Sequence, residues 1–315
     1  MTKSIPRCQV VPLADHQATF TVDGIERLRW HFGPNYPRPF FYPLIGPSGA
    51  ALTRMGHPGA PDHDHHRSIW FAHEKVLGID FWSDRSPARV RQKQWLVYQD
   101  GDDEAIMAVL LGWYDGHDPK ELLMQELIVS TRPIEDGTLV ELQSTFSPLA
   151  DSLELGQTNF GFLAVRVAKS ISQFFGGGEL RSSEGDMGEP AIFGKQARWM
   201  DYSGPMANGR RKPADEVESG KAVVEGITYF DHATNPGYPA YWHVREDGWM
   251  GASFNRTASY AIRRDKPLVL RYLLYAHAGA ANPKNADAIA RHFNERPAFQ
   301  VKRQASGHIQ YSVAR

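Results

Sequence analysis

Short segments in which apolar and polar residues alternate make up most of the chain, and turn-forming residues separate them. In 138–146, Val140, Leu142 and Phe146 fall on one face, with polar residues between them. A period of two residues is typical of a strand with one buried face. An Asp-Gly pair at 136–137 separates this run from the apolar run 122–131. The two runs therefore predict an antiparallel hairpin.

The same pattern predicts further strands at 68–72, 94–98, 104–113, 160–167, 223–230, 260–263 and 268–277. In the last of these, the polar face carries Arg271, Tyr275 and His277. If the sheet is concave, these three side chains line its cupped surface. Otherwise His277 is a surface residue at the end of a strand.

One segment shows a helical pattern. Asn282 is suited to cap it, Pro283 suits its first turn, Ile289 and Phe293 share a face, and Pro297 ends it. A dozen or more strands with one late helix indicate an all-β fold, a large antiparallel β-sandwich with one short C-terminal helix. The chain has 315 residues, and large sandwiches reach this length undivided, so we expect a single β-sandwich domain over 1–315.

Composition narrows the classes of partner. Hydrophobic residues make up 42% and charged residues 23%, and the formal net charge is −1, so nothing indicates binding to nucleic acid or to an anionic membrane. The one cysteine, Cys8, cannot form an internal disulfide. The first residues contain no apolar signal segment, and no stretch approaches the roughly 20 apolar residues that cross a bilayer. We expect a soluble, cytoplasmic protein, and the sequence leaves a homo-oligomer open.

Histidines concentrate in one stretch. Five of the thirteen, His57, His63, His65, His66 and His73, fall within seventeen positions. The segment 62–67 is Asp-His-Asp-His-His-Arg, and an apolar aromatic strand follows it. A loop that enters a rigid strand can hold imidazoles at the mouth of a pocket.

Three interpretations of this stretch remain open. If the loop is extended, His63 and His65 share a face and can ligate a divalent metal with Asp62, Asp64 or a distant Glu, while His66 turns away. The imidazoles can instead act as general acid and base without a metal. Alternatively, they cap backbone groups of a tight loop.

A second constellation lies later in the chain. Asp231 and His232 precede the segment 241–245, Tyr-Trp-His-Val-Arg. The indole of Trp242 suits the apolar face of a sugar ring, and His243 and Arg245 suit its hydroxyls. The alternative is a core tryptophan beside an arginine in a surface salt bridge.

Together these motifs resemble a bacterial family labelled "methane oxygenase PmoA". The resemblance rests on the segments 39–44, 46–49, 52–54, 62–67, 70–71, 80–82, 230–232, 235–236 and 242–245, and it covers nearly the whole chain. The label does not fit a chain without a membrane-spanning segment. The many strands of the family look similar to the galactose-mutarotase-like supersandwich, whose members mostly act on carbohydrates. The sequence has no obvious copy of the aldose-epimerase signature.

The leading hypothesis is a carbohydrate-active enzyme of epimerase, lyase or glycosidase type, which uses general acid–base chemistry on a small sugar or sugar acid. Its alternatives are an enzyme with a divalent metal on His63 and His65, and a non-catalytic sugar-binding module. The predicted catalytic residues are His63, His65, His66, His243 and His277. The predicted substrate-binding residues are Arg67, Trp70, Asp231, His232, Trp242 and Arg245.

Overall fold

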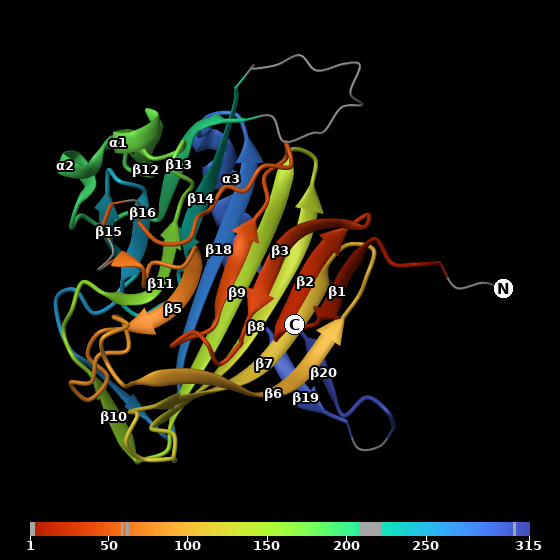
Figure 1. Ribbon diagram of the computed structural model, residues 1–315, viewed down its shortest axis with the longest axis vertical. Coiled ribbons are helices and arrows are strands. Elements are labelled where there is room, and N and C mark those ends of the chain that lie inside the picture. The colour runs from red at the N-terminus through yellow and green to blue at the C-terminus, as the bar shows by residue number, and fades with distance from the viewer. Residues whose placement is uncertain (1–3, 58, 61–62, 208–221, 305–306) are drawn as a thin grey trace.

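The computed structural model describes residues 4–57, 59–60, 63–207, 222–304 and 307–315. Over these residues the protein is mainly β, and two large antiparallel sheets pack face to face (Figure 1). The first sheet has the order β1 (Cys8–Leu13), β2 (Gln17–Val22), β3 (Ile25–His31), β4 (Phe40–Leu44), β5 (Ile69–His73), β11 (Gly161–Arg166), β16 (Trp249–Ser253), β15 (Tyr241–Arg245). The second has the order β12 (Glu179–Ser182), β13 (Trp199–Met206), β14 (Val223–Asp231), β18 (Leu268–Ala278), β9 (Gly137–Pro148), β8 (Leu123–Ile134), β7 (Ala105–Tyr114), β6 (Arg89–Gln99).

The hairpin predicted from the alternating runs is confirmed. β8 and β9 pair antiparallel along their whole length, from Leu123 opposite Pro148 to Ile134 opposite Gly137. The connecting turn is therefore Glu135 and Asp136, one position earlier than the Asp-Gly pair suggests. Two small two-stranded antiparallel sheets join β10 (Ser152–Leu155) to β17 (Tyr260–Arg263), from distant parts of the chain, and β19 (Gln300–Arg303) to β20 (Tyr311–Ala314) in a hairpin.

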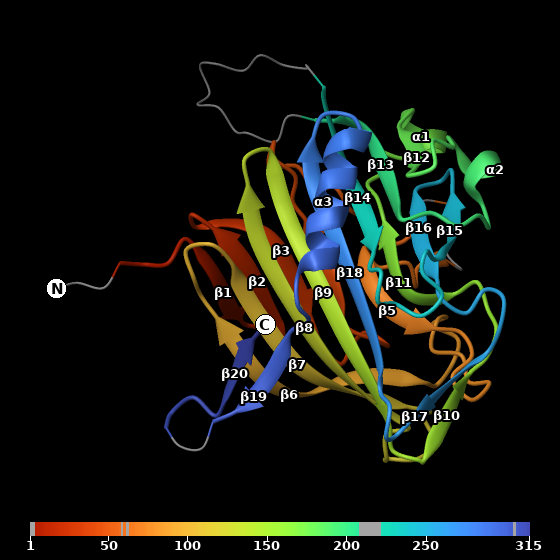
Figure 2. The same ribbon diagram turned by 180° about the vertical axis from the view of Figure 1, so that it is seen from behind.

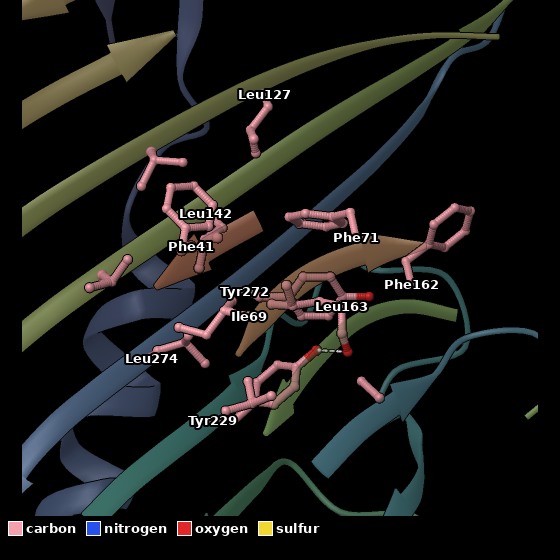
Figure 3. Close-up of a cluster of buried hydrophobic side chains, with 14 of the residues drawn as sticks. Phe41, Ile69, Phe71, Leu127, Leu142, Phe162, Leu163, Tyr229, Tyr272 and Leu274 are labelled. Carbon is pink, nitrogen blue, oxygen red and sulfur yellow. Dashed lines mark hydrogen bonds between the residues drawn. The ribbon is translucent and has the colours of Figure 1, made fainter. Parts of the chain in front are cut away.

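The main core lies between the two sheets. Figure 3 shows side chains of the first sheet, such as Phe71 and Leu163, packed against Tyr229 and Tyr272 of the second. The Tyr229 hydroxyl donates a hydrogen bond to the Leu163 carbonyl at 3.1 Å, so its one buried polar group is satisfied. Because alternate residues of each strand face this core, the residues between them face outward.

Part of the outward face of the second sheet, over β14, β18 and β9, is covered by α3 (Pro283–Glu295), as Figure 2 shows. The predicted cap is confirmed, since the Asn282 side chain accepts a hydrogen bond from the Asn285 amide at 3.2 Å. The expectation that His277 lines a cupped surface is wrong. β18 is covered on both faces, and its outward residues pack near the helix, so His277 is buried at 3% exposure.

Two helices were not expected from the sequence. α1 (Gln173–Gly176) and α2 (Glu189–Ile192) lie beside β12 and the β15–β16 hairpin (Figure 1). Each is about one turn long, and one turn is too short to show a helical period. Local caps hold α1: the Ser172 hydroxyl accepts from the Phe175 amide, and Gly177 ends it at φ 76°. Within the described residues, every helix falls short of the length and hydrophobicity that crossing a membrane requires.

One end of the first sheet carries a second apolar layer on its outward face. It contains Trp70 from β5, Ala164 from β11 and Trp249 from β16, together with Trp82. Small residues make room for these indoles. A Cβ added at Gly251 would lie 3.2 Å from the Trp249 ring, tighter than almost all real contacts. This layer forms the base of the candidate site.

Candidate functional site

A cavity of about 290 Å³ lies on the outward face of the first sheet, beside β5, β11, β15 and β16. These strands are neighbours at one end of the sheet in both views (Figure 1 and Figure 2). The cavity is lined by His63, His65, His66, Glu74, Asp80, Trp82, Ser83, Phe160, Arg166, His243, Arg245, Asp247 and Trp249. It therefore joins the early histidine-rich loop to β15, two segments far apart in the sequence.

The histidine-rich loop is a tight turn. The His66 amide donates to the His63 carbonyl at 3.0 Å. Ring centroids lie 5.9 Å apart for His63 and His65, 5.1 Å for His63 and His66, and 4.3 Å for His65 and His66. The expectation that His66 turns away from the other two is wrong, because it assumed an extended chain. Asp64 is exposed, and Asp62 lies outside the described residues.

The remaining two histidines of the cluster have partners of their own. His57 Nε2 is 2.8 Å from Asp247 Oδ2. His73 is on the core face of β5, with its Nε2 3.0 Å from Asn255 Oδ1. Burial lowers the pKa of His73 to about 4. His73 is therefore a neutral, hydrogen-bonded core residue near pH 7.

Strand alternation divides the 241–245 segment between the two faces of β15. His243 and Arg245 face the cavity, whereas Trp242 and Val244 face the core. Trp242 is fully buried, and its Nε1 donates to the Ala197 carbonyl at 2.8 Å. The prediction that Trp242 contacts a sugar together with Arg245 is wrong. Residues 242 and 245 are an odd number of positions apart, so they cannot share a face of one strand.

Other aromatic side chains form the apolar wall. The Phe160 and Trp249 rings are stacked at 5.9 Å with an angle of 7°. Trp82 lies 5.4 Å from Phe160 and 5.6 Å from Trp249. Phe160 is half-buried, whereas the two indoles are buried. The predicted residue Trp70 lies in the layer beneath, 5.5 Å from the Trp82 ring, and does not line the cavity.

Two imidazoles lie against Trp249. Its ring centroid is 4.0 Å from that of His243 and 5.5 Å from that of His66. Burial lowers the pKa of His243 to about 3, and burial, with His65 and Arg166 close by, lowers the pKa of His66 well below its ordinary range. Both rings are therefore neutral near pH 7, and each can donate one hydrogen bond and accept another.

These two rings have nitrogen atoms left over. His66 Nδ1 has no hydrogen-bond partner among the described residues. For His243, neither nitrogen makes a well-formed hydrogen bond to the described part of the chain, although the Asn159 carbonyl lies close enough to favour the charged ring. Buried polar groups without a partner are uncommon in proteins, and in this cavity they are free to bond a ligand.

An arginine and a carboxylate extend the polar side of the cavity. Arg166 has no exposed side-chain surface, and its Nη1 donates to Asp247 Oδ1 at 2.7 Å. Burial alone would raise the pKa of Asp247, but the Arg166 guanidinium and His57 more than offset it and lower that pKa. Asp247 therefore stays ionised and connects Arg166 with His57.

Both predicted arginines are paired with carboxylates. Arg245 is at the rim, where its Nη1 donates to Glu189 Oε1 at 2.6 Å. Arg67 is next to the cavity but does not line it. Its guanidinium pairs with Asp84 and lies 5.2 Å from the Tyr36 ring.

Three further predicted residues lie away from the cavity. His232 Nε2 is 3.2 Å from the Phe293 carbonyl of α3. His277 Nε2 is 2.8 Å from Asp201 Oδ2, and the His277 ring lies 5.0 Å from that of Tyr275, which packs beneath the same helix. Asp231 accepts hydrogen bonds from Asn235 Nδ2 and the Ala240 amide, and burial raises its pKa to about 7. The structure therefore does not bring these three side chains to the candidate site.

Sequence reasoning did not select Glu74, Asp80, Trp82, Phe160, Arg166, Asp247 or Trp249 as site residues. For Trp249 a signal existed, because a hairpin between 241–245 and the strand after the Gly248 turn places Trp249 opposite Arg245, and opposite residues share a face of the sheet. Arg166 is the last residue of β11, whose other five residues are apolar, and a charged residue is unexpected in such a buried strand. Over the described ranges, no group of three or more His, Cys, Asp or Glu side chains is arranged to hold a metal ion.

Two solved structures have a similar chain path. A presumed aldose 1-epimerase from Escherichia coli K12 is 10% identical with a TM-score of 0.34, and the match covers 86% of this chain and 99% of the other. A 4-alpha-glucanotransferase from Thermococcus litoralis is 10% identical with a TM-score of 0.32, and the match covers 87% of this chain and 40% of the other. At these TM-scores neither structure bears on the activity of this protein.

No curated protein matches the chain. One family model matches residues 17–291, a span that includes the histidine-rich loop, β15 and part of α3. That family has no assigned function, and its description does not mention methane oxygenase. Because the match covers most of the chain, the protein belongs to the family of unknown function DUF6807.

Proposed function

We propose that this protein is a carbohydrate-active enzyme that transfers protons between cavity side chains and a sugar or sugar acid. The observation that supports this most is the convergence of His63, His65 and His66 with His243 in one cavity beside an aromatic wall. An apolar wall beside hydrogen-bonding groups matches the two kinds of surface that a sugar ring presents.

The half-buried Phe160 offers a place for the apolar face of a ring. It stacks on Trp249, so its orientation is fixed before a ligand binds. The two neutral imidazoles, His66 and His243, contact Trp249. A hydroxyl both donates and accepts, as a neutral imidazole does, so these two rings are suited to position sugar hydroxyls.

Proton transfer to and from the substrate requires groups that can exchange protons with water. His63, His65 and Glu74 line the same cavity and are half-buried. We assign the acid and base roles to these three, and the binding roles to the buried pair. Isomerisation, elimination and glycoside cleavage all need an acid and a base.

The test is a turnover screen of the purified protein. Neutral and acidic monosaccharides, including unsaturated ones, are incubated in deuterated water and followed by proton NMR for exchange, isomerisation or elimination. We expect turnover of at least one sugar, with a loss of about 100-fold or more in His65→Ala. The matched control is His117→Ala, which removes an exposed imidazole outside the cavity. Binding without any turnover would favour the non-catalytic sugar-binding module.

A further inference from the structure

The side chain of Arg166 has two hydrogen-bond donors to spare. It is fully buried at the end of β11, it lines the cavity, and its Nη1 is bonded to Asp247. Its Nε and Nη2 find no hydrogen-bond partner anywhere in the part of the chain that the structure describes. A buried guanidinium with two unbonded donors is costly, because each donor has lost its water.

These two donors lie on the same edge of the guanidinium, the edge that binds planar carboxylates in two parallel hydrogen bonds. The protein itself shows this use elsewhere. Arg7 places Nε and Nη2 at 2.8 and 2.9 Å from the two oxygens of Asp23. Arg263 places the same two atoms at 2.9 and 3.0 Å from Asp265. In Arg166 the equivalent edge has no carboxylate of the described chain on it.

Charge at this corner of the cavity favours an anion. Arg54 lies next to Arg166, and its Nη2 donates to the Asp247 backbone carbonyl at 2.8 Å. Burial, and then the positive charge of Arg166, lowers the pKa of Arg54 to about 10. Of these two guanidinium groups, Arg166 is paired with the Asp247 carboxylate, whereas Arg54 bonds only its backbone carbonyl, so this corner stays positive near pH 7.

The other two carboxylates of the lining are already engaged. Asp80 accepts from the Trp82 amide at 2.6 Å and from the Ser83 amide at 3.0 Å. Glu74 accepts from the Thr158 hydroxyl. Among the buried lining groups, those left unbonded are nitrogen atoms, including the Trp82 and Trp249 indoles. A ligand rich in acceptor oxygens would satisfy them.

We propose that Arg166 binds a substrate carboxylate through its Nε and Nη2 edge, so that the enzyme acts on acidic sugars rather than neutral ones. This inference rests on the proposed function and specifies its substrate class. The cavity volume, about 290 Å³, suits a single sugar-sized acid at the lower limit of small-molecule sites. The aromatic wall and the imidazoles then contact the ring.

The test is isothermal titration calorimetry of the full chain near pH 7. The ligands are glucuronate, galacturonate and mannuronate, each with its neutral hexose, and glucuronamide, in which an uncharged amide replaces the carboxylate. Glucose 6-phosphate tests a different anion. We expect at least one uronate to bind about 10- to 100-fold more tightly than its neutral counterparts and than the phosphate.

Variants assign this preference to Arg166. Arg166→Gln should remove the difference between the acid and its neutral counterpart, and Arg166→Lys should retain part of it, since lysine keeps the charge without the planar edge. Arg263→Gln, in an exposed pair outside the cavity, should leave it unchanged. Urea unfolding shows whether each variant is still folded. If Arg166→Gln is not, the affinities of Arg166→Lys for the acid and its neutral counterpart decide.

Three outcomes separate the inference from the proposed function. Equal affinity for uronates and neutral hexoses, or tighter binding of the phosphate, overturns the carboxylate assignment and leaves a carbohydrate enzyme standing. An acid preference that persists in folded Arg166→Gln overturns the assignment to this residue. Failure of every sugar to bind refutes the proposed function and the inference together.

Discussion

The sharpest stability prediction concerns Asp247, on which Arg166 and His57 both depend. Asp247→Asn keeps the shape of the side chain and removes its negative charge. The change leaves the fully buried guanidinium of Arg166 without the carboxylate that now lies 2.7 Å from it. His57 loses its charged partner at 2.8 Å.

The expected loss follows from burial. Removing one member of a buried ion pair costs about 3–5 kcal/mol, because an uncompensated charge stays behind. Asp247 keeps 29% exposure, and water reaching it reduces the effect, so we expect the lower end, about 3 kcal/mol. This is a substantial part of the roughly 5–15 kcal/mol that stabilises a typical domain.

The assay is urea unfolding of both proteins as a function of pH. The pKa of Asp247 is lowered in the folded protein, so its contribution is fully present above the unfolded pKa, near 3.8, and is lost as the pH falls through the folded pKa. The difference in the free energy of unfolding should therefore be constant from about pH 5 to 8 and shrink below about pH 4.

A matched change makes the result interpretable. Asp265→Asn removes the same group from Arg263, but both side chains of that pair are largely exposed, so a small effect is expected. A difference for Asp247→Asn below about 1 kcal/mol near pH 7, or one as large near pH 3 as near pH 7, would contradict the reasoning. An unchanged dependence on urea concentration shows that the denatured state is not responsible.

Other predictions concern residues of the core and of the site. Trp242→Phe should lower the free energy of unfolding by about 1–3 kcal/mol, since it removes the bond to the Ala197 carbonyl, and leave ligand affinity unchanged. Trp249→Phe should weaken uronate binding by about tenfold or more in calorimetry. If Trp242→Phe weakened binding more than Trp249→Phe does, the assignment of Trp242 to the core face of β15 would be refuted. Burial of His277 opposes its charge, but Asp201 raises its pKa overall. The stability lost in His277→Gln should thus be greatest below about pH 6.5 and decline as the pH rises through the folded pKa, measured by urea unfolding; a constant loss would contradict this.

Local patterns predicted most of the fold. The period of two in 138–146 and 268–277, and the caps of α3, depend on neighbours within a few residues, so they can be found without the tertiary structure. The single turns α1 and α2 cannot, because one turn shows no periodicity. The sequence pattern predicted α3 but not its position over β18, although the apolar Leu273 on the outward face of β18 hinted that this face is covered.

The site was predicted in part, for a physical reason. Clustering along the chain identified His63, His65 and His66, and their convergence with His243 and Arg245 is present in the structure. Convergence of single residues such as Arg166 and Asp247 depends on which strands are neighbours, and β11 lies between β5 and β16 through long-range pairing. Proximity along the chain does not show which strands are neighbours in the sheet.

The described lining of the cavity comes entirely from the first sheet and its loops, on the side turned away from the main core. The cavity and the main core therefore lie on opposite faces of the first sheet. Substitutions at half-buried lining positions such as Glu74 and Phe160 leave the packing between the two sheets unchanged. Directed evolution of new specificity should therefore tolerate broad libraries at such positions, provided that the buried pair Arg166 and Asp247 is kept for stability.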